Sequence, residues 1–397
     1  MEAKTLPQEK NILEVIDNLQ VKIWSEIEEK IIGFTKHLIE ELLEEKIKQV
    51  LSADRYERTA DRIGYRNGYY KRDLLTRYGL VEDLRVPRVT GVTVEHDVFD
   101  RYQQRSTSID AAIGCLFLNG ISTRKLRGIV KDLFGRPVSA QTVSKCTAYL
   151  EDELKYYQQR PLTDDVEFLF LDGITERVRD INVEKKVMLC AYGIRSGGRK
   201  EILSFQMADV EDVASWRGFL ADLKSRGLLG KNIQLVITDG NPALIKALKE
   251  IYPFKKRQRC IAHKLRNVVV KLKRYQQKPC MSELKLVFAA ATRREAIKRY
   301  KSWRQKWIIE AERAVKCMEK DLAECLRYFD FDQSLWNSIR TTNILERAFR
   351  ELRRRTRPMN LFPNADSANR IFYGVTKNLN QNWSRKPCHR ISTKGLT

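Results

Sequence analysis

Two apolar stretches, each closed by Asp-Gly, decide the fold. They read VEFLFLDG over residues 166–173 and IQLVITDG over residues 233–240. Runs of this kind are typical of buried strands, so Asp172 and Asp239 are expected at strand ends, on the sheet edge where open α/β folds bind ligands. Asp-Gly is also a common turn dipeptide, and one copy alone would indicate only a turn. Two copies, each after an apolar strand, favour a functional site.

The segments around these two strands predict an α/β sheet flanked by helices. Further strands are expected at residues 186–194, 202–207 and 259–262, and helices at 215–223 and 242–251. In such an order the strands that carry the aspartates can be neighbours. Adjacent carboxylates repel each other, and a divalent cation relieves that repulsion. The pattern therefore predicts a metal site.

A third acid, Glu346, follows a long helical stretch. Residues 264–330 predict helices throughout, and another helix is expected over about 342–355. Glu346 lies in the segment TTNILER and is followed by arginines, of which Arg350, Arg353 and Arg354 lie on the adjoining turns. Alone, this pattern indicates a surface ion pair. Beside two aspartates it favours a metal ligand, with the arginines gripping backbone phosphates.

The amino-terminal third predicts helices and one hairpin. Residues 9–52 have apolar residues at helical spacing and acidic clusters on the other face, as in a pair of helices that needs cover from its own chain or from a second copy. A turn signal at residues 65–68 and alternation to about Val89 predict a hairpin ended by Pro87. Its basic and aromatic residues, Arg66 among them, suit phosphates and bases, although a solvated basic hairpin fits nearly as well.

Residues 109–154 predict a helix-turn-helix. One helix runs from a Ser122 cap to Phe134, and a second starts at a Ser139 cap and reaches about Leu154. The side chains placed to read DNA are Arg124, Gln141, Thr142 and Lys145. An ordinary helical hairpin would show the same pattern, and the surrounding positive charge favours the DNA reader.

The charge of the chain indicates a polyanionic partner. The 397 residues hold 74 Lys and Arg against 51 Asp and Glu, a net charge of +23. Residues 1–50 carry −4, so the rest of the chain carries +27. Neutralisation of phosphates by such a basic body drives nucleic-acid binding.

Other features of the sequence bear on where in the cell the protein is found. No apolar run approaches the roughly 18 residues of a membrane span, and the first residues lack a signal pattern. The eight Cys form no CxxC pair, which favours reduced thiols. We therefore expect the protein in the cytoplasm.

Seven stretches together resemble one family. They are GYRNGY from residue 64, GISTR from 120, LDG from 171, TDG from 238, QRCIAHKLRN from 258, TTNILER from 341 and FPN from 362. In this order, from about residue 56 to a closing Trp383, the chain resembles bacterial insertion-sequence transposases related to the maize Mutator element. The resemblance implies an RNase H-like catalytic fold and the catalytic, metal-binding triad Asp172, Asp239 and Glu346. It also implies two Mg²⁺ ions, for which Mn²⁺ can substitute.

The same resemblance implies what the protein does. It would bind the terminal inverted repeats of an insertion sequence, nick one strand and transfer it to target DNA, by copy-out, paste-in transposition through a circular intermediate. The rivals are an RNase H-like nuclease or resolvase and a DNA-binding regulator without catalysis. Because two element ends must meet, we expect a homodimer.

Two motifs leave alternatives open. The family commonly has Ala after the first aspartate, whereas this chain has Gly-Ile-Thr-Glu, so Glu176 is either an extra acid or an outward-facing strand residue. Zinc at Cys260-x-x-His263 would need two more ligands, and Cys280 offers at most one. The resemblance supports another role, in which His263 contacts DNA or braces the second aspartate and Cys260 packs in the core.

The resulting organisation is multidomain α/β. We expect seven segments: a helical region at 1–55, a basic hairpin region at 56–108, a helix-turn-helix region at 109–158, the first part of the catalytic core at 159–263, an all-helical insertion at 264–330, the second part of the core at 331–385, and a basic tail at 386–397.

Overall fold

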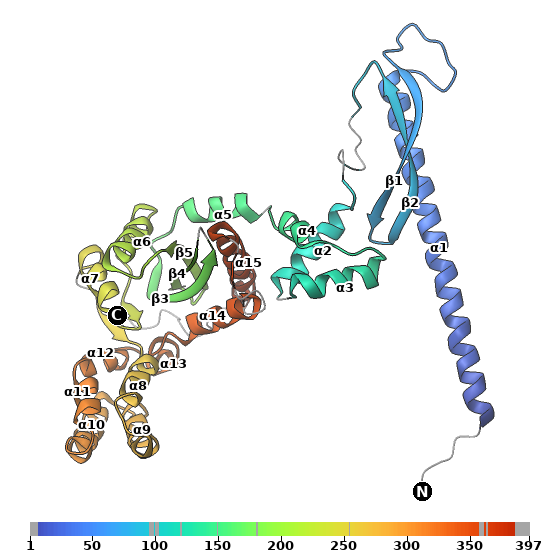
Figure 1. The fold of residues 1–397 in the computed structure, drawn as a ribbon. Helices are drawn as coiled ribbons and strands as arrows, with labels where there is room; N and C mark the ends of the chain where they lie inside the picture. The colour runs from blue at the N-terminus through green and yellow to red at the C-terminus, as the bar shows by residue number, and fades with distance from the viewer. Residues whose placement is uncertain are drawn as a thin grey trace. The chain divides into compact units, whose positions relative to one another are not determined.

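The computed structural model describes residues 7–94, 99, 103–119, 121–148, 150–179, 182–253, 255–356, 361–362 and 364–385. Contacts divide the chain into two compact units, Met1–Thr147 and Ala148–Thr397 (Figure 1). Among the described helices, none combines the length and the apolar character that crossing a membrane requires.

The first unit is built on a single long helix, α1, which spans Pro7–Leu51. The expected pair of helices is therefore wrong: the apolar pattern continues past Gly33, and a lone glycine does not break a helix. The carboxyl half of α1 packs on the hairpin of β1 (Tyr65–Thr76) and β2 (Gly79–Thr90). Leu43 of α1 and Val81 and Leu84 of β2 belong to this core.

The predicted hairpin is confirmed, but two of its details are wrong. The segment from Tyr65 to Gly68 is part of β1 and does not form a turn. Its glycine, Gly68, has a φ of 69° and lies where the pairing of β1 with β2 is irregular, between Arg66 and Tyr69. Pro87 lies inside β2 opposite Tyr69 and does not end the strand. A two-stranded sheet has only edge strands, which tolerate a residue without an amide hydrogen.

Three helices complete the first unit: α2 (Thr107–Leu118), α3 (Thr123–Phe134) and α4 (Ala140–Cys146). Both predicted caps are confirmed, since Ser122 accepts from the amide of Lys125 at 3.3 Å and Ser139 from that of Thr142 at 3.0 Å. The helix expected to continue to Leu154 is wrong. The Thr147 hydroxyl donates to the carbonyl of Ser144 at 2.9 Å, and α4 ends there.

The second unit contains a five-stranded mixed sheet in the order β5-β4-β3-β6-β7. The strands are β3 (Val166–Arg179), β4 (Val183–Arg195), β5 (Lys200–Ala208), β6 (Leu235–Thr238) and β7 (Arg257–Arg259). The first three are antiparallel, and β6 and β7 run parallel to β3. The predicted α/β sheet is thus confirmed. The last strand ends at Arg259, earlier than expected, because α8 begins at Ile261.

Alternate residues of β3 face two different sets of helices. Leu169 and Leu171 belong to a core with α6 (Val213–Ser225) and α7 (Pro242–Ile251). On the other face Phe170 stacks edge-on with Tyr192 of β4, and Tyr192 with Trp383 of α15 (Ala365–Ser384). The sheet is therefore covered on both faces.

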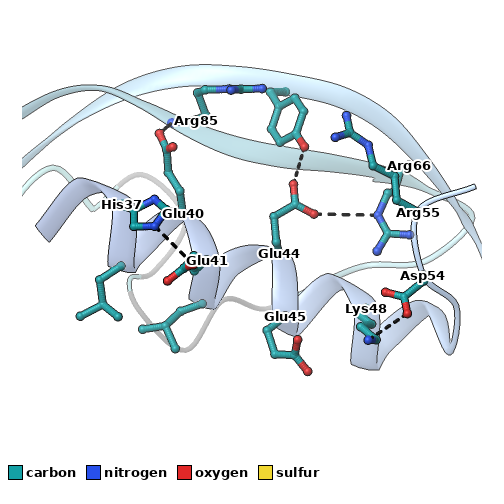
Figure 2. Close-up of a pocket in the computed structure, with 13 residues that line it drawn as sticks. His37, Glu40, Glu41, Glu44, Glu45, Lys48, Asp54, Arg55, Arg66 and Arg85 are labelled. Atoms are coloured by element: carbon teal, nitrogen blue, oxygen red, sulfur yellow. Dashed lines mark hydrogen bonds and ion pairs between the residues drawn. The ribbon is translucent and has the colours of Figure 1, made fainter. Parts of the chain in front are cut away.

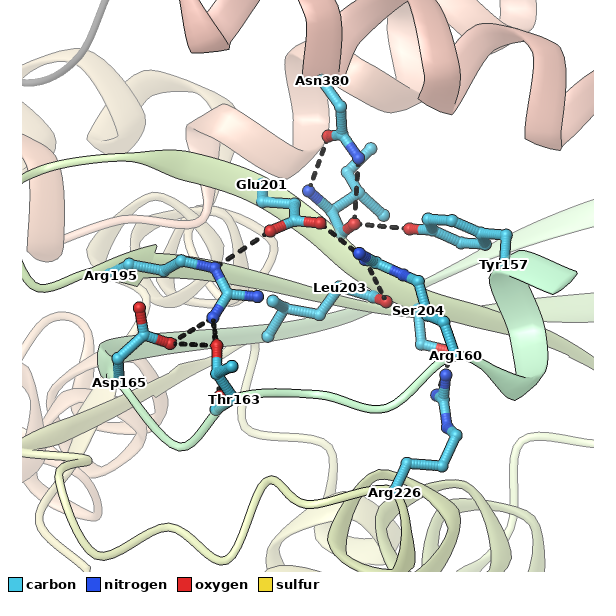
Figure 3. A network of polar contacts seen from close by, with 11 residues as sticks. Tyr157, Arg160, Thr163, Asp165, Arg195, Glu201, Leu203, Ser204, Arg226 and Asn380 are labelled. Atoms are coloured by element: carbon cyan, nitrogen blue, oxygen red, sulfur yellow. Dashed lines mark hydrogen bonds and ion pairs between the residues drawn. The ribbon is translucent and has the colours of Figure 1, made fainter.

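The edge strand β5 is held by a polar network (Figure 3). The Asn380 amide of α15 accepts from the Ile202 amide at 2.8 Å and donates to its carbonyl at 3.1 Å. Tyr157 of α5 (Leu150–Gln159) donates to the same carbonyl. Glu201 is paired with Arg195 at 2.9 Å and with Arg160 at 2.6 Å. The network ties α5 and α15 to the sheet.

The predicted helical stretch after residue 263 is confirmed. It comprises α8 (Ile261–Val269), α9 (Arg274–Phe288), α10 (Arg293–Trp307), α11 (Glu312–Glu319) and α12 (Leu322–Cys325). The short α13 (Trp336–Ile339) follows, and then α14 (Asn343–Thr356), close to the helix expected there.

Candidate active site

The register of the sheet places the two aspartates side by side. In the parallel pair, Leu171 of β3 lies opposite Thr238 of β6, so the next residue of each strand is an aspartate. The prediction that these strands are neighbours is confirmed. One detail is wrong: β3 continues to Arg179, paired throughout with β4, and Asp172-Gly173 is therefore no turn. Asp172 lies in the middle of β3, beside the point where the parallel strand β6 ends at Thr238.

Burial and like charge both act on Asp172. Asp172 is only 6% exposed, and its carboxylate accepts a hydrogen bond from the Gly173 amide at 2.9 Å. Burial raises the pKa of Asp172 to about 7, with a further increase from Asp239 and a partial offset from His263. The pair thus has the electrostatics of a cation site, because a bound positive charge would favour both ionised carboxylates.

The loop after β6 fixes the second aspartate. Asp239 accepts from the Asn241 amide at 2.8 Å, and Asn241 in turn caps α7. Between them Gly240 has a φ of 81°, and a β-carbon there would lie on the buried guanidinium of Arg259. Only glycine combines this φ with so close an approach.

Glu346 stands in the first turn of α14 and faces α8. Arg266 of α8 donates to its carboxylate at 3.0 Å and lies 2.9 Å away through its other terminal nitrogen, and His263 Nε2 is 3.6 Å away. Burial raises the pKa of Glu346, but Arg266 and His263 outweigh it and the net pKa is lowered.

His263 connects the three acids. Its pKa is raised, first by Cys260 and, against the opposing effect of burial, also by Asp172 and Asp239. Since His263 also lies beside Glu346, this imidazole is within electrostatic range of all three carboxylates. The structure adds a neighbour that the sequence did not indicate, Glu346, and the two expected roles of His263, contact with DNA and support of the second aspartate, stay predictions.

Thr342, the last residue before α14, is fully buried beneath this arrangement. Its amide donates to Cys260 Sγ at 3.2 Å, and its hydroxyl lies 3.3 Å from His263 Nδ1. Cys260 is buried, as expected for a core residue. The Cys-x-x-His motif therefore joins the start of α8 to the helix that carries Glu346.

The donor set suits a hard divalent cation better than zinc. Carboxylate oxygens are the ligands that Mg²⁺ and Mn²⁺ prefer. Within the described residues no three His, Cys, Asp or Glu side chains are gathered as a metal site. Asp172 and Asp239 supply carboxylate oxygens of this kind, whereas the carboxylate of Glu346 is paired with Arg266 at 2.9 Å.

Sequence reasoning missed one further acid, Glu211. Its carboxylate is half-buried, accepts from the Trp216 indole at 3.2 Å and lies 3.4 Å from the β-carbon position of Gly173. Burial raises its pKa, and Asp239 contributes to the increase. Its place in the sequence, two residues before α6, gives no sign of this, since acids before helices are common caps. By contrast, Glu176 lies on β3 about 13 Å along the strand from Asp172.

The residues expected to contact DNA fall into two groups. Exposed ones are Arg350, Arg353 and Arg354 on α14, Arg124 on α3, and Gln141 and Lys145 on α4. Thr142 is half-buried, and its amide completes the Ser139 cap. Arg66 is largely covered: it donates to the Ala53 carbonyl at 3.0 Å and lies 3.9 Å from Glu44 of α1 (Figure 2).

The comparisons with known proteins identify the family. Residues 7–386 match the description "Transposase, Mutator family". The chain belongs to the Mutator family of transposases. It is 34% identical over 347 residues to the transposase for insertion sequence element ISRM5 of Rhizobium meliloti, covering 87% of this chain and 86% of that protein. It is 32% identical to the transposase for insertion sequence element IS256 in transposon Tn4001 of Staphylococcus aureus, with 86% and 88% covered. The predicted membership is thus confirmed.

Proposed function

We propose that this Mutator-family transposase cuts and transfers DNA strands with Asp172, Asp239 and Glu346 as its catalytic carboxylates, in a domain of the RNase H-like kind. The observation that supports this most is the parallel register of β3 and β6, which sets the two aspartates next to each other. Glu346 joins them through a shared neighbour, His263.

The same carboxylates would hold two Mg²⁺ ions, or Mn²⁺ in their place. Two such metal ions, when bound, would activate a water molecule and stabilise the leaving oxygen of a phosphodiester. Asp172 and Asp239 would contribute their oxygens without rearrangement, while Glu346 would have to part from Arg266. Arg266 would then be free to pair with a DNA phosphate close to the bond that is cut.

The reaction we propose has two phosphodiester steps at one site. Water first nicks the end of the element and leaves a 3′-hydroxyl. That hydroxyl then attacks a second phosphodiester, which transfers the strand without a covalent protein intermediate. The exposed Arg350, Arg353 and Arg354 would grip the backbone near this site. Copy-out, paste-in transposition through a circular intermediate fits a site that performs both steps.

Recognition of the terminal inverted repeats would fall to the helices of the first unit. Arg124, with Arg127, lines a hollow of about 470 Å³ between α3 and the start of α4. Exposed Gln141 and Lys145 extend that surface along α4. Because two element ends must be joined, we propose that a homodimer is the active form.

The decisive experiment measures nicking and strand transfer on end DNA in Mg²⁺ or Mn²⁺. Asp172→Asn, Asp239→Asn and Glu346→Gln should each lower both rates by about 1,000-fold or more, since each removes a charge that the transition state requires. End binding should persist. The matched control is Glu312→Gln, an exposed acid of α11 that pairs with Lys316, and it should retain activity. Near-normal turnover by one of the three variants would remove that residue from the triad. Normal cutting without strand transfer in the wild-type protein would instead favour a nuclease.

A further inference from the structure

The helix α1 has two apolar faces, and only one of them is covered within the described residues. Ile32, Ile39 and Leu43 pack on the hairpin, followed by buried Ile47 and Leu51. At about 100° per residue, these five occupy one side of the helix. A second apolar set lies on the other side and is exposed: Ile23, Ile27, Ile31, Phe34, Leu38 and Leu42.

The exposed set forms a straight stripe. Ile23, Ile27 and Ile31 are repeated 11 residues later by Phe34, Leu38 and Leu42. Eleven residues make just over three whole turns, about 3.06, so an 11-residue repeat keeps a seam on one side of a long helix. The stripe runs over about 28 Å of helix at roughly 1.5 Å per residue. Such spacing is what two helices need to pack along their length.

The exposure of the stripe is large for a surface helix. Phe34 is 67% exposed and Leu42 51%, and the neighbouring Trp24 is 62% exposed. Contiguous apolar patches of this kind mark interaction sites. The stripe and Trp24 together present roughly 600 Å² per chain, and two chains about 1,200 Å², which reaches the size of a stable protein interface.

We infer that the stripe of α1 packs against the same stripe of a second copy of this chain. A two-fold dimer requires a patch that complements itself, and this one does: with the helices antiparallel, Ile23 meets Leu42, Ile27 meets Leu38, and Ile31 meets Phe34. The α1 helix of the second copy has the same sequence and therefore the same 11-residue repeat. This inference rests on the proposed homodimer and assigns its contact surface.

The test compares the mass of the full chain in solution with that of two charged variants. Ile27→Glu with Phe34→Glu places two carboxylates on the stripe, where dimerisation would bury them. The control, Asn18→Glu with Ser25→Glu, adds the same charge at the same spacing on the opposite, exposed side of α1. Sedimentation equilibrium without DNA should give twice 46.5 kDa for the wild type and the control, and 46.5 kDa for the stripe variant. The dissociation constant should rise by about 100-fold.

A second measurement guards against misfolding of the stripe variant. Circular dichroism should show equal helix content in all three proteins. A photo-crosslinking amino acid at position 34 of the otherwise wild-type chain should attach to α1 of another copy. A monomeric wild type, an unaltered dimer in the stripe variant, or crosslinks that avoid α1 would each overturn the inference. Because these readouts need no DNA, the dimer surface can fail while strand transfer still succeeds.

Discussion

At the scale of single residues, Arg266 is paired with the carboxylate of Glu346 at 2.9 Å. Arg266 is well exposed, with 59% of its side chain accessible, whereas Glu346 is mostly covered. Exposed pairs of this kind contribute at most about 1 kcal/mol. The arginine is therefore a weak competitor for a carboxylate that a divalent cation also attracts.

The first prediction follows from this competition. Arg266→Gln should tighten Mn²⁺ binding to the DNA-free protein about threefold, since roughly 0.7 kcal/mol of ion pairing no longer opposes it. Calorimetry or the electron paramagnetic resonance of Mn²⁺ would measure the change. Lys271→Gln removes the same charge just beyond α8 and should leave affinity unchanged. If affinity fell or stayed constant in Arg266→Gln, the arginine would not be holding Glu346 away from the cation.

At the scale of elements, the attachment of α15 to β5 deserves a measurement because α15 follows the helix that bears Glu346. Asn380→Ala would remove two hydrogen bonds to Ile202: its amide would lose its side-chain acceptor, and its carbonyl would keep only Tyr157 as a side-chain donor. Loss of two such bonds should cost about 1.5 kcal/mol and lower the Tm by about 3–5 °C. Asn382→Ala, an exposed position on the same helix, is the control. An equal Tm in both variants would contradict a bracing role for Asn380.

A second prediction at this scale concerns the DNA-reading surface that we propose on α3 and α4. Arg124→Ala should weaken end binding and reduce the slope of log affinity against log salt by about 0.9, the contribution of one phosphate. Fluorescence anisotropy over a salt series would measure it. Lys155→Ala, an exposed cation of α5, serves as the control. A slope unchanged in Arg124→Ala would place the phosphate contact elsewhere.

Some elements could be predicted from the sequence and others could not, for physical reasons. The spacing of apolar residues along the sequence predicted the strands and α7 well, because burial of one face of an element imposes that spacing. It did not predict the length of β3, since the Asp172-Gly173 dipeptide that signals a turn is paired here with β4. Nor did it predict that α4 ends at Cys146, with Thr147 as its C-cap.

The site was predictable only in part for the same kind of reason. Asp172 and Asp239 follow apolar runs, and the strand order brings them together. Glu211 reaches the site through the fold, and no local pattern marks it; Arg266 lies in the stretch QRCIAHKLRN, but only the fold pairs it with Glu346. Arg66 shows the converse: its basic, aromatic surroundings suggested a DNA contact, whereas in the fold it packs against Glu44 of α1 and the carbonyl of Ala53.

At the scale of the whole molecule, the charge is divided unequally between the two units. Residues 1–147 contain 24 Lys and Arg against 22 Asp and Glu, a net charge of +2. Residues 148–397 contain 50 against 29, a net charge of +21. Nonspecific affinity for DNA follows phosphate neutralisation, whereas sequence is read by side chains placed at base edges. The two units should therefore contribute different parts of DNA binding.

The last prediction separates these parts with two fragments cut at the boundary between the units, 1–147 and 148–397. The first should prefer inverted-repeat DNA over a scrambled duplex by about 100-fold or more, as specific readers do. The second should bind both duplexes equally, with a steep dependence on salt. Anisotropy titrations at several salt concentrations, with circular dichroism to establish that each fragment is folded, would measure both properties. A folded second fragment that selected the repeats would move recognition into the catalytic unit, because its basic surface alone cannot distinguish one sequence from another.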